Sequence, residues 1–299
     1  MLNPDDKYII VNYHYVRDPD PKWGGIHPCP VGDFQKHIAF LKKNFEITDI
    51  AGVYQAAKTR KPGRFCAITF DDGFRDNYEN ALPILKKHNA IGTFFIIGGT
   101  LEGRMPLTHK LHVLFSVMSA GELIDSFNQW AAGAYIIPKD HSINNRRKHG
   151  DMLTNNFKEA MILIDPRLRD GFVDHCFSKK GLDEARLVKD FFMPEELIKD
   201  LDRTGMLIGS HSHGHNSFEV LSAAEIKSDL LASRAILEKI TGKKINTFSY
   251  PHGRYSDQTL AELEAAGFDY AVTIDRRPVS SEDKPLLIPR YDANDLKID

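Results

Sequence analysis

Short apolar runs alternate with amphipathic stretches over most of the chain. β-Branched and aromatic runs predict strands at 8–16, 65–70, 91–97, 206–210, 245–250 and 270–274, with shorter candidates at 45–48 and 286–288. Apolar residues at helical spacing predict helices at 31–44, 77–88, 194–203, 222–241 and 256–266. Because strands and helices alternate, the sequence predicts an α/β fold with a parallel sheet, of the kind that also builds (β/α) barrels.

Residues 100 to about 192 interrupt this alternation. They show helical spacing at 107–118, 120–132, 151–164 and 183–191, a strand candidate only at 135–137, and a polar, turn-like stretch at 144–149. Because strands resume afterwards, we expect a helical insertion within a single domain that covers residues 1–299. Long connections on a rigid scaffold often carry or cover a functional site.

Composition narrows the class of protein. The 299 residues are 42% hydrophobic and 27% charged, and the formal net charge of −2 contains no long block of one sign. Such a charge balance argues against nucleic acid as a partner. No apolar run is long enough for a transmembrane segment, and no signal core follows the N-terminus. Three widely spaced cysteines form no CxxC pair, so a reduced, cytoplasmic location is expected.

Residues suited to catalysis or metal binding follow the predicted strands. They are His14, Asp71, Asp72, His211, His215, Tyr250 and Arg290. In a parallel α/β barrel the carboxyl ends of all strands open on one face, where active sites lie. We therefore expect these side chains to converge on one site.

Two adjacent carboxylates end the strand at 65–70. Neighbouring residues on an extended chain point to opposite sides, so Asp71 and Asp72 are expected to have different roles. One could bind a metal while the other acts as a base, and Gly73 would let the backbone turn out of the strand. The simpler alternative is a strand that ends in an Asp-Gly turn.

His211 and His215 are spaced i, i+4. If their loop begins a helical turn, both rings lie on one side, and a carboxylate completes a three-ligand site that is open to water. Such a site fits zinc or another divalent metal, which lowers the pKa of bound water from about 15.7 toward about 7. A nearby carboxylate could take the proton of that water. A polar loop with incidental histidines is the alternative, and we expect His213 to be no ligand.

Two motifs together resemble the polysaccharide deacetylase (NodB-homology) family of carbohydrate esterases. Residues 69–73 read TFDDG, and residues 211–215 match the family pattern H-[ST]-x-x-H in the same order. The resemblance covers about 8–98 and 194–291. It implies a distorted (β/α) barrel and a metal-dependent N-deacetylase. It also implies that Asp71 is the general base and that Asp72, His211 and His215 bind the metal, usually zinc.

The third family motif is altered. It usually reads R-x-P followed by an aromatic residue, but no arginine occupies that place in residues 248–253. We expect Arg290 to supply the cation that orients Asp71, with a surface salt bridge as the alternative. The hydroxyl of Tyr250, or a backbone N–H near it, is a candidate for stabilising the oxyanion.

The late Leu-x-His motif of the family is also missing. Instead His14 lies near the end of the first strand, and in a closed barrel the first and last strands are neighbours. The chain therefore resembles the circularly permuted branch of the family, with His14 as the general acid. A core histidine is the alternative reading. Because many relatives are exported and no export signal is seen, a cell-wall polymer is the less expected substrate.

The sequence thus predicts a hydrolase that removes an acetyl group from an N-acetylated sugar, an oligosaccharide or a sugar-containing precursor. One alternative is an amidohydrolase that acts on another small C–N substrate. Another is a carbohydrate-binding relative without catalysis. His27, His109 and His112 are read as ordinary surface or core histidines.

Overall fold

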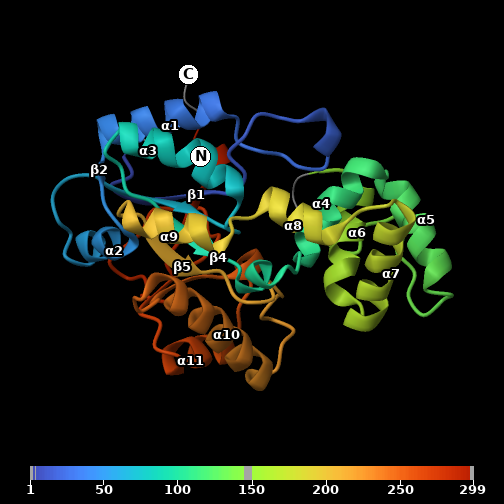
Figure 1. Ribbon diagram of the computed structural model, residues 1–299. Helices are drawn as coiled ribbons and strands as arrows, with labels where there is room; N and C mark the ends of the chain where they lie inside the picture. Colours follow the sequence, from blue (N-terminus) through green and yellow to red (C-terminus); the bar gives the residue numbers. More distant parts are fainter. Residues whose placement is uncertain (1–2, 4, 145–149, 297–299) are drawn as a thin grey trace. The chain divides into compact units, whose positions relative to one another are not determined.

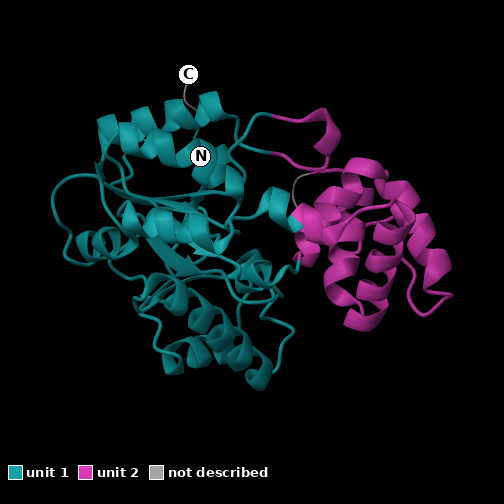
Figure 2. Cartoon of the chain, viewed as in Figure 1, with its two compact units in different colours: residues 1–18, 28–104, 188–299 teal, residues 19–27, 105–187 magenta. Residues whose placement is uncertain are grey.

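The computed structural model describes residues 3, 5–144 and 150–296, so most of the predicted turn at 144–149 lies outside the described residues. The chain forms two compact units, coloured separately in Figure 2. Unit 1 holds residues 1–18, 28–104 and 188–299, and unit 2 holds residues 19–27 and 105–187. A single domain over residues 1–299 stays a prediction.

Unit 1 is built on one parallel sheet. Within the described residues its strands are β1 (Tyr8–Tyr13), β2 (Glu46–Ile47), β3 (Phe65–Phe70), β4 (Thr93–Ile96), β5 (Leu207–Ser210), β6 (Thr247–Ser249), β7 (Tyr270–Val272) and β8 (Tyr291–Asp292). Their order is β7-β6-β5-β4-β3-β1-β8, with β2 beside β3. Every strand pair is parallel, so the predicted parallel α/β architecture is confirmed.

The last part of the chain links the two ends of this strand order. Ile288 forms a parallel bridge with Val272 at the end of β7. Three residues later, β8 begins and pairs with β1. The sheet is therefore curled. The predicted strand at 286–288 is wrong, because only Ile288 bridges and the strand itself forms at 291–292.

Helices connect the strands of unit 1. They are α1 (Val31–Asn44), α2 (Ile50–Lys58), α3 (Leu82–Lys87), α9 (Glu195–Arg203), α10 (Ala223–Thr241) and α11 (Asp257–Ala265). In Figure 1, α1 lies beside α3, and α10 lies beside α11. Helix α10 begins with a capping box between Ser222 and Glu225 and ends at Gly242, whose φ is 69°. Its predicted range is thereby confirmed, whereas α2 was not predicted.

The helix predicted at 77–88 is interrupted. Residues Asn77–Ala81 form a π-helical turn, and α3 follows. Pro83 has no N–H with which to bond the carbonyl of Glu79, so it cannot continue the regular ladder at this point. The turn follows the Asp-Asp-Gly segment directly, and π-helical turns are frequent at functional sites.

The core of unit 1 is made by the buried strands and the helix faces packed on them. Strand β3 is buried along its whole length, which is typical of a parallel sheet covered on both faces. The rings of Phe70 and Phe94 stack with their centroids 4.5 Å apart. Ile226, Leu230 and Leu237 of α10 are fully buried in the same cluster. This packing fixes the strand ends that carry the candidate site.

Unit 2 is helical. Its helices are α4 (Leu107–Val117), α5 (Ala120–Trp130), α6 (Met152–Leu163) and α7 (Pro166–Lys179), and α8 (Glu184–Phe191) begins within it. The buried rings of Phe127 and Phe157 both contact Phe172, with centroids 5.1 and 6.2 Å from it. Helix α7 was not predicted. The predicted strand at 135–137 is wrong, because these residues are irregular and Ile136 is exposed.

The segment 19–27 belongs to unit 2 although it is distant in sequence. The amide of Gly25 donates to the hydroxyl of Ser116 on α4 at 3.0 Å. Among the described residues of the whole chain, no helix has both the length and the apolar character that crossing a bilayer requires.

Candidate functional site

The candidate site begins where β3 ends. Asp71 and Asp72 follow Phe70 directly, and both are buried. The φ angles of Asp72 and Gly73 are 76° and 73°, so the chain leaves the strand through two consecutive left-handed residues. A non-glycine residue in this region is unfavourable, and such residues cluster at functional sites. This turn, and not the alternation of an extended strand on which the prediction relied, separates the two carboxylates.

Three side chains gather beside this turn. The Oδ1 atom of Asp72 lies 3.4 Å from Nε2 of His211 and 3.4 Å from Nε2 of His215. All three donor atoms lie within 4.8 Å of one another, and all three residues are buried. Two ligand atoms that bind one zinc ion tetrahedrally at about 2.0–2.1 Å are about 3.4 Å apart. The spacing therefore fits a single divalent ion.

The loop that carries the two histidines is not helical, which corrects the expected helical turn. Ser212 and His215 have φ angles of 64° and 54°, so the backbone turns through left-handed residues. The rings of His211 and His215 nevertheless meet, with their centroids 4.9 Å apart. The i, i+4 spacing thus brings the rings together by a different backbone path.

Hydrogen bonding assigns the tautomer of His211. Its Nδ1 lies 2.8 Å from the carbonyl oxygen of Ser249, which can only accept, so Nδ1 carries the proton. The lone pair of the neutral ring is then on Nε2, which faces Asp72. A second hydrogen bond of this kind is usual for metal-binding histidines, because it fixes the ring. The donor set fits the divalent metal that the resemblance implied.

Asp71 is held by a different set of partners. Its Oδ1 and Oδ2 accept from Nη1 and Nη2 of Arg290 at 2.9 and 2.8 Å, a bidentate pair. Oδ2 also accepts from Asn12 and from the hydroxyl of Ser249, each at 3.1 Å. Burial raises the pKa of Asp71, but the charge of Arg290 and its hydrogen bonds lower it more, so the pKa lies well below its ordinary value. The carboxylate is ionised at neutral pH.

Arg290 is buried, so the surface salt bridge considered as the alternative is excluded. Besides Asp71, its guanidinium donates to the carbonyl of Thr273 at 3.0 Å and to Asn12 Oδ1 at 2.9 Å. It also donates to the Ser249 hydroxyl at 2.9 Å. The predicted contact between Arg290 and Asp71 is present, although the arginine follows β7 in sequence and lies just before β8.

His14 lies beyond the end of β1 and is exposed, so the alternative of a core histidine is wrong. A positive charge on His14 would lower the pKa of Asp71. The carbonyl of His14 accepts from the side-chain amide of Asn77 at 2.7 Å. Because β1 pairs directly with β3, the strand ends that precede His14 and Asp71 are neighbours.

Tyr250 does not face the other candidates with a donor. Its hydroxyl donates to the carbonyl of Leu286 at 2.8 Å, and its amide donates to the carbonyl of Val272 at 3.3 Å. The side chain is buried. Both donors are engaged within the fold, so neither the hydroxyl nor this amide is available to a substrate oxygen in this structure.

Three further residues at the site were not predicted. Asn12 and Ser249 both contact Asp71 and Arg290. The ring of His252 lies 4.7 Å from that of His215. The signal for Asn12 is a polar residue within an otherwise apolar strand. The sequence gives no comparable signal for Ser249. Its contacts with Asp71 and Arg290 depend on the pairing of β6 with β5 and β7.

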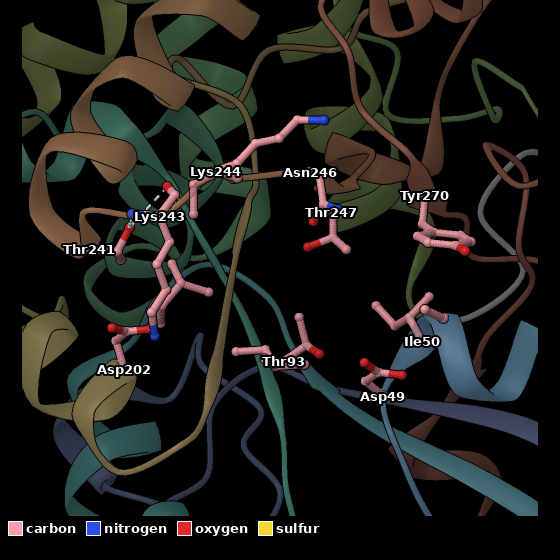
Figure 3. A pocket seen from close by; sticks show the side chains of 14 residues that line it. Asp49, Ile50, Thr93, Asp202, Thr241, Lys243, Lys244, Asn246, Thr247 and Tyr270 are labelled. Carbon is pink, nitrogen blue, oxygen red and sulfur yellow. Dashed lines mark hydrogen bonds and ion pairs between the residues drawn. The ribbon is translucent and has the colours of Figure 1, made fainter.

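A separate cavity lies at the opposite ends of the strands. Figure 3 shows this cavity of about 200 Å³, which is lined by the first residues of four strands, Thr93, Leu207, Thr247 and Tyr270. The described residues that line it include none of the predicted site residues. Conserved positions at this end of a barrel usually serve stability. The candidate site is therefore the cluster at the carboxyl ends.

A family model and several known proteins match the chain. The family model described as polysaccharide deacetylase matches residues 58–120 and 155–271, more than half of the chain. YxkH of Bacillus subtilis, which is named as a polysaccharide deacetylase, is 22% identical over 270 residues, or 89% of this chain and 64% of YxkH. The chain thus spans less than two thirds of that relative.

The poly-beta-1,6-N-acetyl-D-glucosamine N-deacetylase of Staphylococcus aureus MSSA476 is 23% identical over 97% of this chain and 80% of that protein. Two solved structures share the fold. The deacetylase PplD of Streptococcus pyogenes in complex with acetate matches with a TM-score of 0.62 and 18% identity, over 96% of this chain and 92% of PplD. IcaB from Ammonifex degensii matches with a TM-score of 0.60 and 17% identity, over 96% of this chain and 91% of IcaB. The predicted NodB-type barrel is confirmed. The chain belongs to the polysaccharide deacetylase family, which implies a divalent metal.

Proposed function

We propose that this protein is a metal-dependent hydrolase that removes the N-acetyl group from an N-acetylated sugar or glycan. The observation that carries the proposal is the position of the Asp72–His211–His215 cluster beside the separate Asp71–Arg290 pair, in a chain of this family. The named activity of the Staphylococcus relative favours N-acetylglucosamine polymers as the substrate class.

We assign Asp72, His211 and His215 as the metal ligands and zinc as the metal. Two imidazoles and one carboxylate are a usual catalytic zinc set, and three protein ligands leave a position open. When bound, such an ion acidifies a water molecule and polarises a carbonyl oxygen.

The chain's own residues supply the proton transfers. Asp71 takes a proton from the water that attacks the acetyl carbon, and Arg290 holds both of its oxygens in place. Among the described residues, Oδ1 of Asp71 accepts only from Arg290, so this oxygen is the better placed to receive the proton. His14 gives a proton to the amide nitrogen. The C–N bond then breaks, and acetate and a free amine leave.

Acetate release tests the proposal. The zinc-loaded protein should release acetate from N-acetylglucosamine oligomers, and Asp71→Asn should abolish this while leaving zinc binding intact. Asp72→Ala, His211→Ala and His215→Ala should abolish both. Full turnover in any of these variants would refute the assigned roles. Sugar binding without hydrolysis by the zinc-loaded wild type would instead indicate a non-catalytic relative.

A further inference from the structure

The loop that presents the two histidines needs support, because its backbone is unfavourable. Ser212 and His215 are both non-glycine residues with positive φ. Such conformations persist only where the surrounding structure determines them. Two sets of contacts hold this loop, one through its carbonyls and one through its amides.

The carbonyls face the turn after β4. Gly98 donates to the carbonyl of Ser212 at 3.0 Å, and Gly99 donates to that of His213 at 2.9 Å. A Cβ atom on Gly98 would lie 2.8 Å from Nδ1 of His213, and one on Gly99 would lie 2.7 Å from the His213 carbonyl oxygen. Only glycine allows the two backbones to approach so closely.

The amides face one carboxylate on α10. Oδ1 of Asp229 accepts from the amide of His213, and Oδ2 accepts from that of Gly214, each at 2.7 Å. The Ser212 side chain is among the groups that lower the pKa of Asp229. The Ser212 hydroxyl accepts from the amide of His215 at 2.7 Å. The carboxylate therefore holds His213 and Gly214, which lie between the two proposed histidine ligands.

We propose that Asp229 is a positioning residue for the metal centre, holding the 211–215 loop so that both histidines face Asp72. This inference rests on the proposed metal site. Asp229 lies six positions beyond the start of α10, so it is not capping its own helix. A carboxylate has two acceptor oxygens and no donor, and its hydrogen bonds are stronger than those of a neutral acceptor. An asparagine would turn an N–H₂ group toward one of the loop amides.

Metal affinity measured on the metal-free protein tests this role. Asp229→Asn should weaken Zn²⁺ binding by about 10- to 100-fold, as other changes behind metal ligands do, in competition with a chromogenic chelator. The thermal midpoint of the metal-free variant should change little. The absorption bands of the Co²⁺-loaded variant should shift, because the two imidazoles are no longer held in place.

Glu238→Gln is the matched control. Glu238 lies on the same helix, and its carboxylate likewise accepts from a backbone amide, that of Ile245 at 3.0 Å. It contacts neither the loop nor the donor cluster, so its variant should bind Zn²⁺ with wild-type affinity. A general effect of weakening α10 would instead lower the affinity of both variants.

The outcomes separate the two proposals. Unchanged Zn²⁺ affinity in Asp229→Asn, with loss of binding in His211→Ala, would overturn the role of Asp229 and leave the metal site standing. Retained Zn²⁺ binding in His211→Ala would overturn both the role of Asp229 and the proposed metal site. If Asp229→Asn does not fold, Asp229→Glu decides: it keeps the charge but displaces both carboxylate oxygens from the loop amides by one methylene group. Wild-type affinity in that variant would overturn the inference.

Discussion

Asp71 and Arg290 depend on each other because neither charge has access to water. Their side chains are 3% and 1% exposed, and two parallel hydrogen bonds join them. Removing one partner of such a pair leaves the other charge buried and uncompensated, which costs more than the pair itself contributes. The proposed catalytic carboxylate and its arginine therefore stabilise the protein as a pair.

Arg290→Met should lower the free energy of unfolding by about 3–5 kcal/mol, because it leaves the Asp71 carboxylate buried without a cation. The double variant Asp71→Asn/Arg290→Met should cost less than the sum of the two single changes. Urea unfolding of all four proteins measures the coupling. Additive costs would show that the two side chains do not stabilise each other.

Among the elements, the π-helical turn at 77–81 supports the segment that follows β1. Asn77 donates to the carbonyl of His14, and Asn80 donates to that of Val16 at 2.8 Å. Arg17 of the same segment pairs with Asp76 at 2.5 Å. The turn after β3 thus holds the chain that carries the proposed general acid.

Asn77→Ala should lower kcat by up to about 100-fold, because a displacement of about 1 Å at a proton donor can cost that much. Asn80→Ala is the control variant. It loses a similar hydrogen bond, whose acceptor is a carbonyl two residues beyond His14. Both should lose about 1 kcal/mol of stability in thermal unfolding. Equal kcat values for the two variants would argue against a role of Asn77 in placing His14.

The turn at 98–99 can be tested with one methyl group. Gly98→Ala should destabilise the protein by about 1–3 kcal/mol, because its Cβ would meet His213 at 2.8 Å and Ser233 Cα at 3.1 Å. Gly32→Ala, in α1, meets nothing within 4 Å and should stabilise the helix by about 0.5–1 kcal/mol. Chemical denaturation compares the two. A neutral Gly98→Ala would mean that the turn and the loop can separate without cost.

At the scale of the whole molecule, all proposed metal ligands belong to unit 1, whereas the buried aromatic cluster around Phe172 belongs to unit 2. Phe172→Ala should cost about 3–5 kcal/mol of stability, because it leaves a cavity beside Phe127 and Phe157. Zn²⁺ affinity should stay at the wild-type value. Calorimetry and metal titration measure the two effects, and a parallel loss of affinity would show that the units are energetically coupled.

Much of the fold of unit 1 was predictable because its strands and helices have clear periodicity. The run before Asp71 and the capped, amphipathic α10 are examples. Helix α2 was missed because its nine residues give few repeats of the pattern. Helix α7 was missed because its first half is polar and its buried residues begin only at Phe172. The predicted cytoplasmic location stays a prediction.

The proposed metal ligands were predictable because two short motifs carry them. The contacts around them were not, because they depend on strand register and on backbone conformation. Asn12 reaches the site because it pairs with Thr69, two residues before Asp71. The left-handed φ of Ser212 has no signal in the sequence, since serine rarely adopts it. The expected helical turn therefore failed at that residue.

The distance along the chain between Asp71 and its arginine has a consequence for synthesis. The two residues are 219 positions apart, and Arg290 lies in the segment that joins β7 to β1. Domains fold as their chains leave the ribosome, at about 5–20 residues per second. At that rate the cation is made more than about ten seconds after the aspartate. The nascent protein should therefore acquire activity late, in one step, when residue 290 emerges.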